Sequence, residues 1–208
     1  MYMKKKTAII IAACAIALGA LFFILKGNEP EVLNRDSQGT TIVSFGDSLI
    51  YGVGSSDGND FISLLSQRIG QPIINLGING NTTADGLARI DKALAKDPKI
   101  VILLLGGNDY LRKIPSDETF RNLDLMVKAI QKQGSMVLLL GVRGGLLTDI
   151  FADRFETFAK THKVAYVPNV LAGLIAKNEY MSDAVHPNDA GYKKIADKVE
   201  PVLKKLLK

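Results

Sequence analysis

The sequence predicts an α/β fold in three α/β/α layers, with helices on both faces of a parallel sheet and a transmembrane helix at the N-terminus. Three observations predict it. From Thr41 onward, short apolar runs alternate with longer amphipathic stretches, and this alternation requires the crossover connections of a parallel sheet. The 208 residues are 47% apolar and 23% charged, which suits one sizeable core rather than two ordinary domains. Before Thr41, the chain contains an uncharged apolar segment that is long enough to span a membrane.

The membrane-spanning segment is the first element of the chain. Thr7 to Leu25 form a run of 19 residues without a charge, and a helix of that length covers roughly the hydrocarbon thickness of a bilayer. Three lysines at positions 4–6 precede it, and the positive-inside rule places them in the cytoplasm. We therefore expect residues 1–26 to be an uncleaved signal anchor in a bacterial cytoplasmic membrane, with the following domain in the periplasmic or extracellular space.

Two alternatives to the anchor remain. Cleavage after Leu18-Gly19-Ala20 would make the protein secreted, but it would leave an apolar new terminus. Ile11-Ala12-Ala13-Cys14 is similar to the lipobox of bacterial lipoproteins, in which the cysteine carries the lipid. Residues 27–40 lack apolar periodicity, so we expect a linker there and a globular domain over residues 41–208.

The elements of this domain follow in regular order. We expect strands where short apolar runs lie between turn residues: Thr41–Phe45, Pro72–Leu76, Ile100–Leu105, Met136–Leu140 and Val164–Val167. We expect helices where apolar residues recur with the helical period: Asp60–Ile69, Thr83–Ala95, Asp117–Gln133, Asp149–Thr161 and Asp189–Leu207. Ser116 or Asp117 is a suitable N-cap for the third helix, and Gly134 follows it where a left-handed C-terminal residue belongs.

Charge and scarce residue types exclude several functions. The formal net charge is +5, but four lysines lie in the first 26 residues, which leaves 22 basic and 21 acidic residues for the rest. A nearly neutral domain does not favour a nucleic-acid partner. The single cysteine excludes an internal disulfide and any site with several cysteine ligands. A mechanism that needs an imidazole has two candidates, His162 and His186.

Candidate functional residues follow the strands, because ligands of open α/β sheets bind beyond the carboxyl ends of the strands. Ser48 follows the first strand, and the loop around Gly80 after the second can offer backbone N–H groups to an oxyanion. Asn108 follows the third strand. Asp183 precedes His186 by three residues, which allows the carboxylate to orient the imidazole so that its other nitrogen accepts a proton.

Other polar residues are expected to be structural. Pro187 keeps His186 out of a helix interior, whereas His162 is expected at the surface, at a helix C-terminus. Asp47 and Asp109 are expected to accept hydrogen bonds from loop N–H groups. A metal site built from Asp47, Asp109, Asp183 and His186 remains an alternative, since their oxygen and nitrogen donors gather at one edge of the sheet.

Four motifs together resemble a known family. Gly46-Asp47-Ser48-Leu49, Gly80, Gly106-Gly107-Asn108-Asp109 and Asp183-x-x-His186-Pro187 occur in the order found in GDSL esterases of the SGNH hydrolase superfamily, which have a flavodoxin-like fold. The segment from Asn75 to Gly80 and Thr82 is closest to the bacterial thioesterase I, lysophospholipase L1 and arylesterase type. The resemblance implies that Ser48 is the nucleophile, His186 the base and Asp183 its orienting group. It implies an oxyanion hole formed by Ser48, Gly80 and Asn108.

The implied activity is hydrolysis of carboxylic esters through an acyl-enzyme, without a metal or organic cofactor. The expected partners are a small-molecule or lipid acyl ester, and the membrane through the N-terminal helix, near which the anchor would hold the site. A polysaccharide or peptidoglycan O-acetylesterase is the alternative enzyme, and a non-catalytic envelope-binding module is the alternative of another class. The segment Gly141–Leu147 contains no aromatic residue, although relatives often use this loop to shape the acyl pocket, so acyl-chain preference stays open.

Overall fold

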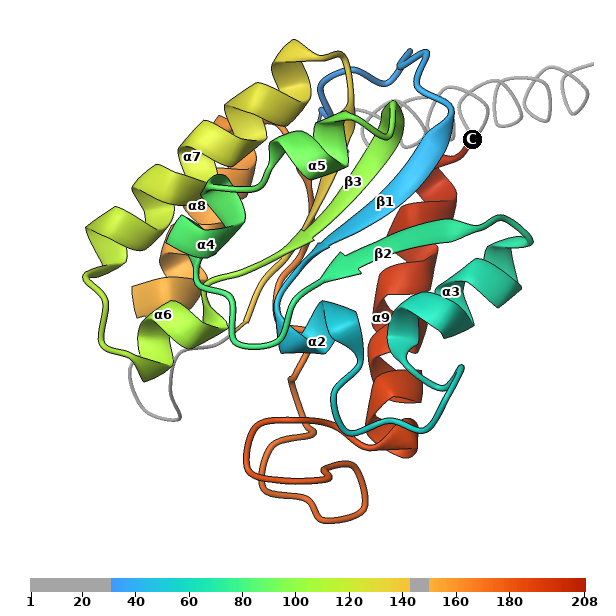
Figure 1. The fold of residues 1–208 in the computed structure, drawn as a ribbon, viewed down its shortest axis with the longest axis vertical. Helices are drawn as coiled ribbons and strands as arrows, with labels where there is room; N and C mark the ends of the chain where they lie inside the picture. Colours follow the sequence, from blue (N-terminus) through green and yellow to red (C-terminus); the bar gives the residue numbers. More distant parts are fainter. Residues whose placement is uncertain (1–30, 143–149) are drawn as a thin grey trace, which may run out of the picture. The chain divides into compact units, whose positions relative to one another are not determined.

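The computed structural model describes residues 31–142 and 150–208, and the predicted anchor with Cys14 lies outside these ranges. Its centre is a five-stranded parallel sheet in the order β2-β1-β3-β4-β5. The strands are β1 (Thr41–Gly46), β2 (Ile73–Gly77), β3 (Pro98–Leu104), β4 (Met136–Leu140) and β5 (Ala165–Val167), and Figure 1 labels the first three. The predicted α/β fold with a parallel sheet is confirmed.

Eight helices are described in the two ranges. They are α2 (Ser48–Tyr51), α3 (Phe61–Ile69), α4 (Thr83–Leu87), α5 (Asp91–Leu94), α6 (Gly107–Leu111), α7 (Ser116–Lys132), α8 (Ile150–Thr161) and α9 (Asp189–Leu206). No helix among the described residues is long and apolar enough to cross a membrane.

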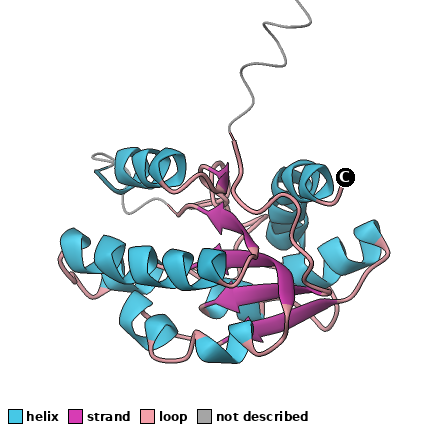
Figure 2. Ribbon diagram, turned by 90° about the horizontal axis from the view of Figure 1, so that it is seen from above, coloured by secondary structure: helices cyan, strands magenta, loops and turns pink. Residues whose placement is uncertain are grey.

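The helices lie on both sides of the sheet, as Figure 2 shows from above. Successive side chains of a strand point to opposite faces, so each buried strand contributes to two cores. Ile100, Ile102 and Leu104 of β3 belong to a cluster with residues of α3 and α9. Val101 and Leu103 belong to the other cluster, with residues of α7 and α8. Continuous apolar runs such as that of β3 are therefore what a strand covered on both faces requires.

Two local predictions were wrong in detail. The predicted helix Thr83–Ala95 is two helices, α4 and α5, and between them Arg89 N–H donates to Gly86 O and Ile90 N–H to Leu87 O, with i→i+3 spacing. Neither Ser116 nor Asp117 caps α7, because its N-cap is Pro115 and carries no side-chain cap bond. Gly134 does follow α7 with a φ of 87°, a conformation that suits glycine.

The described part of the predicted linker contacts the domain at the edge where the strands begin. Leu33 N–H donates to Lys163 O at 2.9 Å, and the Asn34 amide donates to Gln131 O and Ser135 O at 2.8 and 3.0 Å. These acceptors lie at the C-terminal ends of α7 and α8 and in the turns that follow them. Residues 32–40 therefore join the domain at the edge opposite to the carboxyl ends of the strands.

Candidate active site

The carboxyl ends of the strands bring together the loops that carry the candidate residues. Figure 1 shows α2, α6 and the loop between β5 and α9 at this end of the sheet. The strand order places β1 between β2 and β3, so the segments after β1 and β3 start from neighbouring strands. This is the point where the direction of chain progression reverses, and open α/β sheets bind ligands there.

Ser48 is the first residue of the short helix α2, directly after β1. Gly46 allows the end of β1 to lie close to β3, because a Cβ at this position would collide with Leu104 O. The Asp47 carboxylate caps α2 by accepting the Leu49 N–H at 3.0 Å. Ser48 is buried at 7% exposure, and it begins a helix whose orphan N–H groups point toward its N-terminal end.

Three of the predicted site residues form one hydrogen-bonded series. His186 Nε2 lies 3.1 Å from Ser48 Oγ, and His186 Nδ1 lies 2.7 Å from Asp183 Oδ2. An ionised carboxylate can only accept, so the proton of a neutral imidazole must be on Nδ1. Nε2 then has a lone pair directed at the serine hydroxyl. This arrangement can take a proton from Ser48 when the serine attacks an electrophile.

Asp183 is held in the ionised form by its surroundings. Its Oδ2 faces His186, and its Oδ1 accepts the backbone N–H groups of Val185 at 2.8 Å and His186 at 2.7 Å. These bonds, with the His186 side chain as the largest cause, lower the pKa of Asp183 to about 2. The carboxylate therefore remains a hydrogen-bond acceptor at any pH at which a neutral imidazole is present.

The loops of Gly80 and Asn108 meet beside the serine-bearing helix. Asn108 Nδ2 donates to Asn81 O at 3.0 Å, and Gly80 has a φ of 77°. Arg112 Nη2 donates to Gly80 O at 2.8 Å, which fixes the orientation of the Gly80–Asn81 peptide. Asn75 of β2, the strand before the Gly80 loop, bonds to α2, since its amide donates to Ile50 O at 2.7 Å.

Arg89 supports this arrangement and was not predicted from the sequence. Its guanidinium donates to Gly46 O at 2.8 Å, Leu76 O at 2.9 Å and Asn81 Oδ1 at 2.7 Å. It also lies over the Phe45 ring, 4.1 Å from the centroid. One side chain thus ties together the ends of β1 and β2 and the Gly80 loop. An arginine within a predicted amphipathic helix carries no local signal for such a role.

The two buried acids are structural, as predicted. The Asp109 carboxylate accepts the Thr83 N–H at 2.9 Å and the hydroxyls of Thr83 and Thr119. Burial, with a smaller contribution from the nearby Asp109, raises the pKa of Asp47 to about 7. Within residues 31–142 and 150–208, no three His, Cys, Asp or Glu side chains are placed to hold a metal ion.

His162 was predicted to be a surface residue at a helix C-terminus; the helix C-terminus is confirmed, but the residue is half-buried rather than exposed. It follows α8, but its side chain is only 14% exposed, with Nε2 3.2 Å from Asp124 Oδ1. Its ring centroid lies 4.2 Å from that of Phe158. Burial lowers the pKa of His162. The second histidine is therefore part of the packing between α7 and α8, at the edge opposite to Ser48.

The chain is similar to known hydrolases over most of its length. The model of the GDSL-like lipase/acylhydrolase family matches residues 44–194. The chain is 31% identical over 188 residues to esterase TesA of Pseudomonas aeruginosa, covering 85% of this chain and 94% of that protein. It is 28% identical over 172 residues to thioesterase 1/protease 1/lysophospholipase L1 of Escherichia coli K12, covering 78% and 83%.

A solved structure agrees with these sequence comparisons. The crystal structure of TesA superposes with a TM-score of 0.74 at 30% identity, covering 80% of this chain and 99% of that one. The relatives are named as enzymes that hydrolyse esters and thioesters, which favours the hydrolase over the non-catalytic module considered above. The chain belongs to the GDSL-like lipase/acylhydrolase family and is a carboxylic ester hydrolase.

Proposed function

We propose that Ser48 is the nucleophile of this esterase, with His186 as general base and Asp183 as the group that orients it. The observation that carries the proposal is the hydrogen-bonded series from Ser48 through His186 to Asp183. Ser48 Oγ attacks the ester carbonyl while its proton passes to His186 Nε2. That proton then goes to the leaving alkoxide as the acyl-enzyme forms. Water, deprotonated by His186, then attacks the acyl carbon. The bond between this carbon and Ser48 Oγ breaks, the proton on His186 returns to Ser48 Oγ, and the carboxylic acid is released.

We propose that the oxyanion is met by the backbone N–H groups of Ser48 and Gly80 and by the Asn108 amide. The Asn108 amide nitrogen has two N–H donors, and its bond to Asn81 O at 3.0 Å uses one of them. Anchoring one donor fixes the direction of the other, which is the preorganisation that stabilises a developing negative charge. The bond from Arg112 to Gly80 O fixes the Gly80–Asn81 peptide, which adjoins the peptide that carries the Gly80 N–H.

A fluorophosphonate probe tests the assignment of the nucleophile. The folded wild-type protein should be labelled at Ser48, and the variants Ser48→Ala and His186→Ala should lose both labelling and ester hydrolysis. Ser66→Ala is the matched control, because Ser66 is a serine of α3 that donates to Gln71 O. Full activity of Ser48→Ala would overturn the proposal. Activity abolished by a chelator would favour the metal alternative instead.

We propose that the physiological substrate carries an acyl chain longer than acetyl. Five large apolar side chains within three residues of a proposed site residue along the chain are exposed: Tyr51 (62%), Ile78 (43%), Tyr110 (44%), Leu111 (58%) and Val185 (37%). Such exposure near a nucleophile suits the apolar part of an ester, because burial of each CH₂ group contributes about 0.8 kcal/mol. The lysophospholipase name of the Escherichia coli relative agrees with this class.

p-Nitrophenyl esters of increasing acyl length distinguish the two enzyme classes. The proposal expects kcat/KM to rise from acetate to at least octanoate. Activity confined to acetate would instead favour the polysaccharide or peptidoglycan O-acetylesterase. Leu125→Ala removes an exposed apolar side chain (46%) on α7, and this control variant should show the same dependence of kcat/KM on acyl length as the wild type.

We propose that residues 7–25 anchor the enzyme in the bacterial cytoplasmic membrane, with the hydrolase domain outside. The uncharged run and the preceding lysines support this topology. Residues 32–40, which follow this segment in the chain, contact the domain at the edge where the strands begin, opposite to the edge that carries Ser48. Protease added to intact spheroplasts should digest the domain. Protection of the domain would overturn the orientation, and release into the medium would favour cleavage.

A further inference from the structure

The loop that carries His186 is bonded mainly to itself. His186 O accepts the Ser182 N–H at 2.9 Å and the Ser182 hydroxyl at 3.0 Å. Asn188 N–H donates to Tyr180 O at 2.9 Å, and Met181 pairs with Pro187 in an isolated bridge. These bonds define the shape of the loop but not its distance from Ser48. Contacts with another part of the chain must set that distance.

The segment after Ser48 is a second unit with its own internal bonds. Ser48 O accepts the N–H groups of Gly52 and Val53 at 2.9 and 3.0 Å, and Gly52 O accepts the Ser55 hydroxyl at 2.8 Å. The positions of residues 52–56 are thereby related to that of the nucleophile. A contact between this segment and the start of α9 would align the serine with the histidine.

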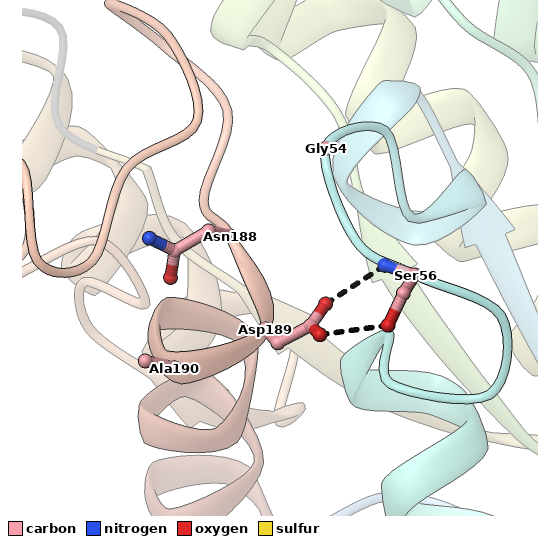
Figure 3. A pocket seen from close by; sticks show the side chains of 5 residues that line it. All are labelled: Gly54, Ser56, Asn188, Asp189 and Ala190. Atoms are coloured by element: carbon pink, nitrogen blue, oxygen red, sulfur yellow. Dashed lines mark hydrogen bonds between the residues drawn. The ribbon is translucent and has the colours of Figure 1, made fainter.

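The Asp189 carboxylate makes such a contact. Its Oδ1 accepts the Ser56 N–H at 2.8 Å and its Oδ2 accepts the Ser56 hydroxyl at 2.7 Å. Figure 3 shows this fork across an open pocket, with Gly54 on one side and Asn188 and Ala190 on the other. Ser56 lies eight residues after the nucleophile, and Asp189 lies three residues after the histidine.

Two neighbouring contacts bring the same segments together. The Tyr192 hydroxyl donates to Val53 O at 2.8 Å. Gly54 has a φ of 94°, and a Cβ there would collide with Ser182 Oγ and Pro187 O. The backbone of the segment after Ser48 therefore lies directly against the loop of His186.

Helix capping does not account for Asp189. The N-cap of α9 is Asn188, whose Oδ1 accepts the Gly191 N–H at 3.1 Å. An acid in the first turn is ordinarily favoured by the helix dipole. Here, however, both carboxylate oxygens are bonded to Ser56, and these bonds lower the pKa of Asp189. The direction of the side chain is set by the contact with the segment after Ser48.

We propose that Asp189 and Ser56 are positioning residues that keep His186 Nε2 at hydrogen-bonding distance from Ser48 Oγ. The inference rests on the proposed roles of Ser48 and His186. Without the fork, the self-bonded loop can shift relative to α2, and a displacement of about 1 Å at a reacting pair lowers rates by up to about 100-fold. Because the fork is exposed and neighbouring contacts remain, we expect a smaller loss of about tenfold in kcat.

Variants of Asp189 and Ser56 test the proposal in the full chain. Asp189→Ala should lower kcat and the rate of fluorophosphonate labelling about tenfold, with KM changed less than twofold. Asp189→Asn should retain most of the activity, because its amide can still accept the Ser56 N–H and donate to the Ser56 hydroxyl oxygen. Ser56→Ala should lower kcat in the wild-type background but have little further effect in Asp189→Ala.

The matched control is Asp197→Ala, farther along α9. Asp197 accepts a bond from Arg68 at 2.9 Å, so its loss also removes a contact between α9 and another helix. It should lower the melting temperature about as much as Asp189→Ala while leaving kcat unchanged. Equal losses of kcat in both variants, or wild-type kcat in Asp189→Ala, would overturn the inference. If Asp189→Ala does not fold, unchanged kcat in Ser56→Ala overturns it equally.

The two proposals fail in different ways. Retention of full activity by Ser48→Ala or His186→Ala would contradict the proposed catalytic roles. Loss of activity in those variants, with wild-type kcat in Asp189→Ala and Ser56→Ala, would contradict only the positioning role.

Discussion

Asp183→Asn is expected to lower kcat by about 10³- to 10⁴-fold, because the substitution changes His186 Nδ1 from a hydrogen-bond donor to an acceptor. Asp183 Oδ1 accepts two backbone N–H groups, at 2.8 and 2.7 Å, and only the oxygen of a carboxamide can take that place. The amide nitrogen then takes the place of Oδ2, 2.7 Å from His186 Nδ1, and donates to it. The imidazole proton must move to Nε2, which can no longer accept the proton of Ser48.

The expected loss corresponds to about 4–5.5 kcal/mol of transition-state stabilisation. The assay is steady-state hydrolysis of p-nitrophenyl butyrate between pH 6 and 9, with the melting temperature measured in parallel. Asp124→Asn is the matched control, because Asp124 pairs with the other histidine, His162, at 3.2 Å. This control should keep kcat within twofold. A folded Asp183→Asn enzyme whose kcat is within tenfold of wild type would refute the tautomer argument.

Three further predictions concern the supporting residues. Asn108→Ala should lower kcat by roughly 10²- to 10³-fold through loss of an oxyanion donor, measured with the same ester. Arg89→Lys should lower the free energy of unfolding by about 1–3 kcal/mol, since one ammonium cannot serve three acceptors in a planar fork. Urea denaturation measures this loss, and Arg154→Lys is the control, because the Arg154 guanidinium bonds to the side chains of Ser116 and Asp117 at the start of α7. Asp47→Asn should change the pH dependence of stability. The raised pKa of Asp47, about 7, means that the folded state retains a proton that the unfolded chain loses above about pH 4, so wild-type stability falls between pH 4 and 7 by up to about 4 kcal/mol. The variant should lack this fall, and identical pH profiles of the unfolding free energy would contradict the assignment.

The local pattern of the chain was sufficient for most of the secondary structure. Strand β4 matches its predicted bounds, Met136–Leu140, because a continuous apolar run between turn residues has few other solutions. The predicted helix Thr83–Ala95 was wrong because its interruption depends on other elements. Arg89 lies at the break and bonds to Gly46 O and Leu76 O, which belong to two strands. The amphipathic pattern of residues 83–95 does not predict hydrogen bonds to acceptors on distant strands.

The sequence by itself determined that Ser48, Gly80, Asn108 and His186 share one edge of a sheet, because parallel strands all end on the same side. Only the tertiary structure decided how they are placed. The strand order puts β1 beside β3, and the Ser48–His186 distance of 3.1 Å joins residues 138 positions apart. Other contacts also join distant segments: the Ser56–Asp189 fork, the bonds of Arg89 and the pairing of His162 with Asp124. Periodicity and turn chemistry act over a few residues, whereas such contacts depend on strand order and side-chain packing, which local patterns do not specify.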